Sequence, residues 1–196
     1  CQLFGMTETS GCTALRPEDH DPVNKPHLLS SAGVVAHGFE VRVVNDQDVD
    51  VQVGEVGEVI CRGPALMDGY LGDEEATAAA LRGGWMHTGD LGKLDDEGYL
   101  YITDRKKDMI ISGGANIFPA EIEAVLMRAP FVRDVAVFGA PDPEFGEQVV
   151  AAIEPNDGWT PDKAEVMDFL TQKLARFKHP RLIDFHVSLP REDSGK

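Results

Sequence analysis

The stretch Leu100-Tyr101-Ile102-Thr103-Asp104-Arg105-Lys106-Lys107-Asp108-Met109-Ile110-Ile111-Ser112 decides how the chain is divided. Five residues in its middle, 104–108, are all charged, and apolar runs with strand-forming residues lie on either side. A dense run of charge between two apolar strands suits an exposed connection between domains. We therefore expect a first domain over residues 1–103, a hinge at 104–108 and a second, mobile domain over 109–196.

Upstream of the charged run, short β-rich segments alternate with turns. Residues 39–44 and 56–61 show a period-two pattern of side chains that is typical of strands, and the residues at 45–48 favour a turn between them. Period-two patterning interrupted by turns predicts antiparallel strands. A short helix is expected at 73–81, where Gly83-Gly84 would stop it. The first domain is thus predicted to contain a small antiparallel β-barrel-like subdomain.

Downstream of the charged run, strands and helices are mixed. Thr160 is the expected N-cap of a helix, with Pro161 at its first position. The predicted order is strand 109–112, turn 113–114, helix 119–129, strands 135–138 and 149–153, helix 161–175 and strand 182–187. Such an order predicts a compact α+β domain, so the whole chain is assigned to the α+β class.

Composition limits the partners of the chain. A formal net charge of -16 argues against nucleic acid or an anionic membrane, because both would meet a repulsive field. No apolar run approaches the roughly 20 residues that span a bilayer. Three cysteines at these spacings match no zinc motif or disulfide framework, which favours a reducing cytoplasm. Nucleotides remain allowed where local cations, backbone N–H groups or a metal neutralise their phosphates.

Residues 2–9, Gln-Leu-Phe-Gly-Met-Thr-Glu-Thr, are expected to form an active-site loop. The ring of Phe4 can lie on a purine, and Gly5 lets a ligand approach the backbone. Thr7 can hydrogen-bond a phosphate oxygen, and Glu8 can ligate Mg²⁺ directly or through water. An ordinary turn followed by a helix cap would fit the same residues.

Two further residues suit a nucleoside. The two carboxylate oxygens of Asp90, which follows Thr88-Gly89, match the adjacent 2′ and 3′ hydroxyls of a ribose. Arg105 offers a planar, permanently charged fork to phosphate or ribose. Taken alone, Asp90 also fits a surface turn whose carboxylate caps its own backbone, and Arg105 fits a solvated charge run.

Two more segments suit an extended or mobile ligand. Gly113-Gly114 presents a surface without side chains, along which a thin ligand arm could slide. The alternative is that the two glycines only form a tight turn. Ser194-Gly195-Lys196 places a lysine on a flexible arm, where it can deliver one positive charge to a transition state. A tail without function is the alternative for the latter.

In this order, the segments resemble the superfamily of acyl-CoA synthetases, non-ribosomal peptide adenylation domains and firefly luciferase. The resemblance covers essentially the whole chain. Its four motifs are residues 4–8, 88–90, 104–108 and 190–196. The text between them is also similar, notably Gly57-Glu58-Val59, Gly69-Tyr70, Pro119-Ala120-Glu121-Ile122-Glu123 and Ala175-Arg176-Phe177-Lys178.

The resemblance implies a two-step reaction with ATP, Mg²⁺ and coenzyme A. A carboxylate attacks the α-phosphorus of Mg·ATP to give an acyl-adenylate and pyrophosphate, and the thiol of CoA then displaces AMP. The second domain would rotate about the hinge between the steps. The resemblance implies that Gln2 and Phe4, beside Gly5 and Met6, contact adenine, that Thr7 contacts the α-phosphate and that Glu8 binds Mg²⁺. It implies that Asp90 binds the ribose, that Ile102 contacts the base and that Arg105 contacts ribose or phosphate.

In the second domain and the hinge, the resemblance implies that Lys107 is the hinge residue and that Gly114 lines the pantetheine tunnel, with Gly113 and Asn116 also binding the cofactor. Lys196 would act in adenylation.

Two departures from the family pattern stand out. Phe4 replaces the commoner tyrosine, which should keep stacking but lose a hydroxyl. Glu192-Asp193 makes the approach to Lys196 acidic, and this negative charge would raise the pKa of the lysine or hold it away from phosphate.

The motifs around 112–117 and 174–180 resemble CoA ligases more than peptide-synthetase domains. The first hypothesis is therefore an acid–thiol ligase that activates a fatty or aryl acid for CoA, with a fatty acid as the expected substrate. An enzyme that delivers to a carrier-protein phosphopantetheine, and a non-catalytic nucleotide-binding relic, are the alternatives. The phosphate loop and acid pocket are expected upstream, so we expect the chain alone to be inactive and its exposed apolar surface to favour homo-oligomers.

Overall fold

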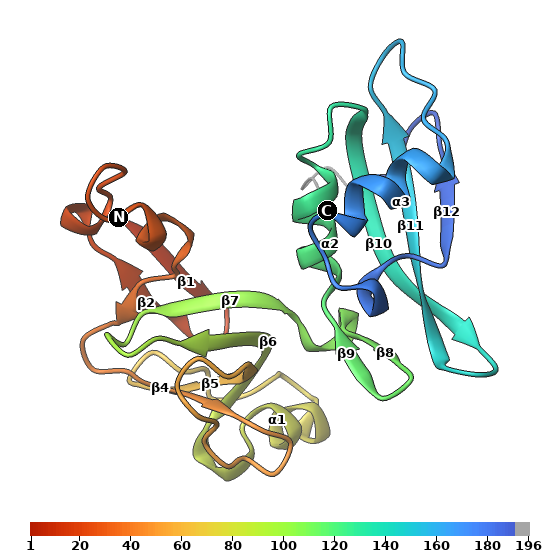
Figure 1. Ribbon diagram of the computed structural model, residues 1–196. Helices are drawn as coiled ribbons and strands as arrows, with labels where there is room; N and C mark the ends of the chain where they lie inside the picture. The colour runs from red at the N-terminus through yellow and green to blue at the C-terminus, as the bar shows by residue number, and fades with distance from the viewer. Residues whose placement is uncertain (191–196) are drawn as a thin grey trace. The chain divides into compact units, whose positions relative to one another are not determined.

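The computed structural model describes residues 1–190, and Lys196 lies outside this range. The chain separates into two compact units, Cys1–Lys106 and Lys107–Lys196 (Figure 1). The division falls inside the charged run, between two consecutive lysines. Mixed helices and antiparallel sheets confirm the α+β class.

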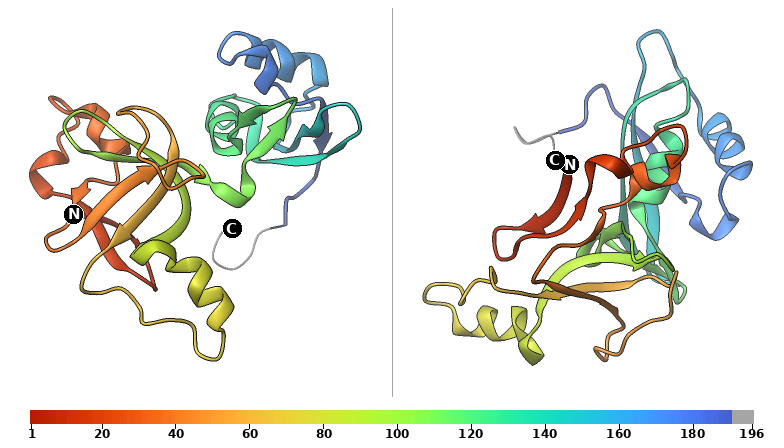
Figure 2. Two further views of the ribbon diagram at one scale, coloured as in Figure 1. Left: turned by 90° about the horizontal axis from the view of Figure 1, so that it is seen from below. Right: turned by 90° about the vertical axis from the view of Figure 1, so that its left-hand side faces the viewer.

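The first unit contains two antiparallel sheets. One has the order β1-β2-β3 and the other β4-β5-β6-β7, and an isolated bridge between Gly33 and Leu100 links them. The β1–β2 hairpin is drawn in red in Figure 2. The strands are β1 (Gln2–Met6), β2 (Ser10–Leu15), β3 (Val34–Val35), β4 (Glu40–Val44), β5 (Gly57–Arg62), β6 (Met86–Leu94) and β7 (Leu100–Arg105). Short helical segments are η1 (Pro17–Asp19), η2 (Pro26–Ser30), α1 (Glu74–Ala80) and η3 (Arg82–Gly84).

Phe4 connects the interiors of the two sheets. It packs against a buried cluster of Ala32, Val43, Val59 and Leu100 and against a second cluster of Cys12, Cys61 and Met86. Burial of these apolar side chains supplies the main stabilisation of such a small unit. The hairpin that carries Phe4 is therefore fixed to the sheet that carries Asp90.

The second unit is one sheet with two helices. The sheet has the order β10-β11-β8-β9, and β12 pairs with β11 in parallel. Buried residues of α2 and α3 share one core with Val149, Ala151 and Ile153 of β11, so both helices cover the same face. Segment η4 (Lys106–Asp108) begins at the last residue of the first unit. The other elements are β8 (Ile110–Ser112), β9 (Ala115–Ile117), α2 (Pro119–Leu126), β10 (Val132–Asp142), β11 (Gly146–Pro155), α3 (Lys163–Thr171), η5 (Arg176–Lys178) and β12 (Leu182–Phe185).

Several expected boundaries are wrong for physical reasons. The N-cap of α3 is Asp162 and not Thr160, since the Asp162 carboxylate accepts a hydrogen bond from Glu165 N at 2.9 Å. Helix α2 ends at Leu126, three residues early, because Pro130 disfavours helical geometry just before it. The expected loop at residues 2–9 is largely strand β1, followed by a turn.

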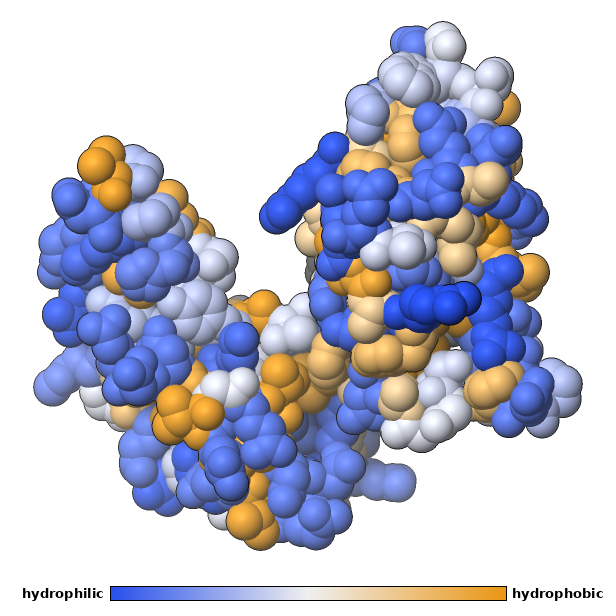
Figure 3. All heavy atoms as spheres, in the orientation of Figure 1, coloured by the Kyte–Doolittle hydropathy of each residue, from blue (hydrophilic) through white to orange (hydrophobic). Residues whose placement is uncertain are grey.

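The surface of the described residues is mainly hydrophilic on the face seen in Figure 3, in keeping with the net charge of -16. Some large apolar side chains are nevertheless exposed, including Leu71 and Val187. Self-association through such groups remains a prediction. Among residues 1–190, no helix is long and apolar enough to cross a membrane.

Candidate functional site

Asp90 and Arg105 form an ion pair at the end of the second sheet. They lie opposite each other in the antiparallel register of β6 and β7, and Arg105 Nε is 2.7 Å from Asp90 Oδ1. Asp90 is 8% exposed, whereas the side chain of Arg105 is about half exposed. The structure thus brings together two predicted nucleoside residues that are 15 positions apart in the sequence.

Thr88 holds the backbone that leads into Asp90. The Thr88 hydroxyl donates a hydrogen bond to the Val59 carbonyl on β5 at 2.7 Å and accepts one from Asp90 N at 3.1 Å. Thr88 is itself buried. The threonine of this motif therefore positions the aspartate, and the surface-turn alternative for Asp90 is wrong because the residue lies within strand β6.

The turn after β1 is held by Thr9. Its hydroxyl accepts a hydrogen bond from Met6 N at 3.1 Å and donates one to the Ser10 carbonyl at 2.8 Å. Thr9 is fully buried, while Thr7 is exposed at the turn. An exposed hydroxyl in a fixed turn is available to a phosphate oxygen, as expected for Thr7.

Glu8 has an unforeseen partner. The Tyr70 hydroxyl donates a hydrogen bond to Glu8 Oε1 at 2.9 Å, and Met67 N donates one to the Glu8 carbonyl at 2.8 Å. The hydrogen bond to Glu8 raises the pKa of the Tyr70 phenol above its ordinary value. Tyr70 thus orients the predicted magnesium ligand from 62 residues away, a relationship that no local pattern reveals.

The remaining residues of β1 have mixed environments. Gln2 is exposed, Phe4 and Met6 are half-buried, and the Cys12 thiol donates a hydrogen bond to the Phe4 carbonyl at 3.5 Å. Ligand access at Gly5 stays a prediction, and the structure adds a packing reason for glycine at this position. A Cβ at Gly5 would lie 1.7 Å from the Ser10 carbonyl oxygen, so the bulge at this point accepts only glycine.

Two predicted site residues lie near the end of the first unit. Ile102 is 37% exposed on β7, where it pairs with Gly92 of β6. An exposed apolar side chain on a strand offers a contact for the face of a base, as the family resemblance implies. Lys107, the predicted hinge, is exposed and is the first residue of the second unit.

In the second unit, Gly113 and Gly114 form the turn of the β8–β9 hairpin. Both have left-handed backbone geometry, with φ of 58° and 80°. A Cβ at Gly113 would lie 3.1 Å from Phe145, whereas a Cβ at Gly114 would meet no atom within 4 Å. Asn116 is exposed on β9. The turn therefore presents bare backbone beside Gly114, which fits the predicted passage for a thin ligand arm.

A cavity of about 640 Å³ opens beside this turn. Cationic side chains on its wall are Lys163, Arg176 and Arg181, and the guanidinium of Arg181 lies 3.7 Å from the centre of the Phe145 ring. The sequence patterns did not identify Lys163 or Arg181, and they included Arg176 in the family-like segment 174–180 without assigning it a role. The full lining is Ser112, Gly113, Ala115, Phe145, Lys163, Met167, Arg176, Phe177, His179, Pro180, Arg181 and Ile183.

The segment that contains η5 and the residues after it is held by contacts with α2, Leu174 and β11. Lys178 Nζ lies 2.6 and 2.7 Å from the two carboxylate oxygens of Glu121 on α2. His179 Nε2 is within hydrogen-bond distance, 3.0 Å, of the Leu174 carbonyl, and Arg181 N donates to the Val149 carbonyl at 2.9 Å. These contacts fix the segment that presents Arg176 and Phe177 to the cavity.

The chain is similar in sequence to known proteins. The family model described as AMP-binding enzyme matches residues 1–71, and the one described as AMP-binding enzyme C-terminal domain matches residues 121–196. Indoleacetate–CoA ligase of Aromatoleum aromaticum is 43% identical over 195 residues, and feruloyl-CoA synthase of an Amycolatopsis species is 42% identical over 196. Each alignment covers 100% of this chain but only 38% and 39% of the relative, respectively.

Solved structures agree with these relatives. The chain superposes on o-succinylbenzoate CoA synthetase from Bacillus subtilis, in complex with the acyl-adenylate intermediate OSB-AMP, with a TM-score of 0.88. The two are 38% identical, and the match covers 100% of this chain and 39% of the other. The fold and the two matching family models thus define a member of the AMP-binding enzymes with a separate C-terminal unit. The chain belongs to the adenylate-forming superfamily of AMP-binding enzymes.

Proposed function

We propose that the full-length protein is an AMP-forming acid–thiol ligase, which joins a carboxylic acid to CoA through an acyl-adenylate. The observation that carries the proposal is the Asp90–Arg105 pair in a chain of this superfamily. The chain spans less than two fifths of its curated relatives, so the other substrate-binding parts are expected in the remaining length.

The nucleoside is assigned to the first unit. A carboxylate accepts more than one hydrogen bond, so Asp90 can receive ribose hydroxyls while Arg105 engages its Oδ1. The exposed part of the Arg105 fork then lies next to the phosphate or ribose. Phe4 is half-buried, so one part of its ring packs in the core while the rest is available to adenine.

Magnesium is assigned to Glu8. Residues 1–190 contain no group of three or more His, Cys, Asp or Glu side chains that could hold a metal ion. A single carboxylate suits Mg²⁺ bound to a nucleotide, because this ion takes its other ligands from phosphate oxygens and water. The ion would neutralise phosphate charge during attack by the acid. Tyr70 would keep the Glu8 carboxylate in place. A solved complex of the Bacillus subtilis synthetase contains ATP and magnesium ion.

The cavity in the second unit favours CoA as acceptor. CoA carries a diphosphate and a phosphorylated nucleoside beyond its pantetheine arm, whereas a carrier-protein phosphopantetheine has a single phosphodiester that joins it to protein. Three cations beside Gly113 suit an anionic arm. A fatty acid–[acyl-carrier-protein] ligase of Streptomyces coeruleorubidus is nevertheless 40% identical over 196 residues, so carrier delivery is the second candidate.

An aryl acid is proposed ahead of the fatty acid that the sequence suggested. The relatives named for indoleacetate, ferulate and 2-succinylbenzoate act on acids that contain an aromatic ring. These names support an acid–CoA ligase and give no support to a fatty acid in particular.

The test is pyrophosphate release by the full-length protein across aryl and fatty acids, with and without CoA. We expect release with at least one aryl acid and acyl-CoA formation when CoA is present. Accumulation of acyl-adenylate without acyl-CoA would move the assignment to the carrier-dependent candidate. Absence of pyrophosphate release with every acid would contradict both candidates.

A further inference from the structure

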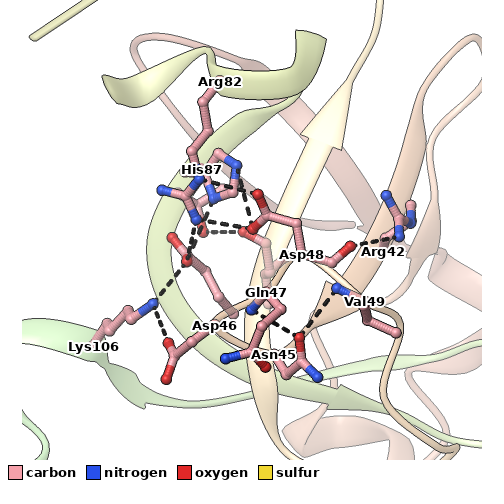
Figure 4. A network of polar contacts seen from close by, with 12 residues as sticks. Arg42, Asn45, Asp46, Gln47, Asp48, Val49, Arg82, His87 and Lys106 are labelled. Carbon is pink, nitrogen blue, oxygen red and sulfur yellow. Dashed lines mark hydrogen bonds and ion pairs between the residues drawn. The ribbon is translucent and has the colours of Figure 1, made fainter. Parts of the chain in front are cut away.

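A cluster of charged side chains in the first unit joins the strands that carry the proposed nucleoside residues. It brings together the turn after β4, strand β5, segment η3, strand β6 and the residue that follows β7 (Figure 4). Its members are Asp46, Asp48, Glu58, Arg82, His87 and Lys106. None of these residues contacts a substrate in the reaction proposed above.

Glu58 is the centre of this cluster. The residue is 5% exposed. Its Oε2 lies 3.1 Å from Lys106 Nζ, 3.4 Å from His87 Nδ1 and 3.8 Å from Arg82 Nη2. A buried carboxylate that loses a cationic partner is left with an uncompensated charge, which is strongly unfavourable. Glu58 therefore holds its partners more firmly than an exposed carboxylate would.

His87 lies between two carboxylates. Its side chain is 6% exposed, its Nδ1 faces Glu58, and its Nε2 is 4.0 Å from Asp48 Oδ1. Arg82 fixes Asp48, because Arg82 Nε and Nη2 donate hydrogen bonds to the two carboxylate oxygens at 3.1 and 2.9 Å. Within the described part of the chain, His87 Nδ1 has no hydrogen-bond partner. Close contact with the two fixed carboxylates therefore limits the movement of the imidazole ring.

Lys106 has a second carboxylate partner. Its Nζ lies 2.9 Å from Asp46 Oδ1, and the Lys106 side chain is 37% exposed. Partial burial works against the ammonium charge, but hydrogen bonds to Asp46 and Glu58 outweigh it and raise the pKa of Lys106. The lysine thus stays charged in neutral solution and remains attracted to Glu58.

The side chain of Glu58 contacts a sequence neighbour of each half of the nucleoside pair. Lys106 directly follows Arg105, and His87 lies three residues before Asp90. Arg105 and Asp90 are themselves joined by the 2.7 Å ion pair. One buried carboxylate thus restrains the chain beside both members of the pair.

The backbone around Glu58 adds a further link to Asp90. Val59, the residue after Glu58, accepts the hydrogen bond from the Thr88 hydroxyl at 2.7 Å, and the same hydroxyl accepts one from Asp90 N at 3.1 Å. In the register of β5 and β6, Glu58 lies opposite Leu91, the residue after Asp90. Displacement of Glu58 would therefore be transmitted to Asp90 through side chain and backbone alike.

We propose that Glu58 is a positioning residue for nucleotide binding, which keeps Asp90 and Arg105 in register through its contacts with His87 and Lys106. Without the Glu58 charge, Lys106 keeps only Asp46, an exposed partner of the kind that contributes little. The pair beside it is then less well held, and the ribose is bound less tightly. This inference rests on the proposed function, because that function assigns the ribose to Asp90.

The test is the KM for ATP of the full-length protein, measured by pyrophosphate release for the wild type and for Glu58→Gln. Glutamine keeps the shape of the side chain and removes its charge. Coupling within one charged network supports a rise in the KM for ATP of about threefold to tenfold. The KM for the carboxylic acid should stay at its wild-type value. A loss of folded protein would instead lower kcat and leave both KM values unchanged.

The double variant with Asp90→Asn makes the test specific. If Glu58 acts through Asp90, the effect of Glu58→Gln should largely disappear once Asp90 has lost its charge, so the KM should rise by less than about twofold beyond that of Asp90→Asn. A role of Glu58 in stability alone would give no such dependence on Asp90.

Two single variants complete the set. Glu97→Gln removes the same charge from an exposed position in the turn between β6 and β7, and should keep the wild-type KM for ATP. Lys106→Met removes one partner of Glu58 at a partly exposed side chain, and should give a smaller rise in that KM without risk to the fold.

An unchanged KM for ATP in Glu58→Gln would overturn the proposal. If that variant does not fold, an unchanged KM in Lys106→Met would overturn it equally. An equal rise in Glu97→Gln, or a full additional rise in the double variant, would also contradict it. In each of these cases the wild type still releases pyrophosphate and the proposed function stands, whereas absence of release by the wild type would contradict both.

Discussion

Asp90 and Arg105 face each other across β6 and β7, with Arg105 Nε 2.7 Å from Asp90 Oδ1. Arg105 is the last residue of β7 and lies one residue before the end of the first unit. Loss of this contact should therefore weaken nucleotide binding.

Asp90→Asn in the full-length protein should weaken ATP binding. The amide loses the charge that receives ribose hydroxyls and pairs with Arg105. A hydrogen bond to a charged group contributes about 1.5–3 kcal/mol, which corresponds to a rise in the KM for ATP of about 10- to 150-fold. Steady-state rates of pyrophosphate release at varied ATP concentrations measure this KM.

The matched control for that substitution is Asp96→Asn, which removes the same charge from an exposed turn of the same unit. The control should keep the wild-type KM for ATP. Equal effects of the two substitutions would mean that net charge, and not the ribose contact, governs binding.

Lys196→Ala should separate the two half-reactions. The residue lies outside the described range, and its adenylation role rests on the family resemblance. We expect the variant to lose adenylation while thioester formation from preformed acyl-adenylate stays largely intact. The two rates are measured separately, and an equal loss in both would contradict the assigned role.

Gly114→Leu should have the opposite effect. A side chain at this turn would occupy the open backbone surface and obstruct the thiol arm, so thioester formation should fall while adenylation continues. The positive φ of 80° also adds strain of about 1–2 kcal/mol for any L-residue. Gly114→Ala carries this strain with little bulk and is the control. If alanine and leucine slow thioester formation equally, strain and not obstruction is the cause.

Lys178→Met should raise the KM for CoA without changing adenylation. The Lys178–Glu121 pair holds the segment that presents Arg176 and Phe177 to the cavity. A partly exposed pair contributes up to about 1 kcal/mol, so a rise of up to about fivefold in the KM for CoA is expected. Initial rates of acyl-CoA formation at varied CoA concentrations measure this KM.

Exchange of the two charges tests that role for Lys178. The double variant Lys178→Glu with Glu121→Lys should recover part of the lost affinity, because the attraction is restored in reverse. A KM for CoA that is unchanged in Lys178→Met would show that the pair does not position the cavity wall.

Local patterns were sufficient for most of the fold. The alternation at 39–44 and 56–61 predicted β4 and β5, and the charges and alanines at 73–81 predicted α1, which the Asp73 side chain caps by accepting a hydrogen bond from Ala76 N. The N-cap of α3 was misplaced because Thr160 and Asp162 both have capping side chains. Only the folded chain shows which one accepts the hydrogen bond.

Relationships between distant segments could not be predicted in this way. Asp90 and Arg105 were identified singly, but their pairing depends on the register of β6 and β7. Lys106 contacts Glu58, which lies 48 positions upstream, and Asp46, which lies 60 positions upstream (Figure 4). Tyr70 reaches Glu8 from 62 positions away. The cavity likewise combines the β8–β9 turn with α3 and η5. Periodicity and spacing contain no information on such contacts.

The central claim is that the full-length protein makes a thioester through an adenylate. The most direct measurement is product analysis after incubation with Mg·ATP, CoA and an aryl acid such as indoleacetate. We expect AMP, pyrophosphate and acyl-CoA in equal amounts. Formation of ADP and inorganic phosphate with the thioester would contradict it.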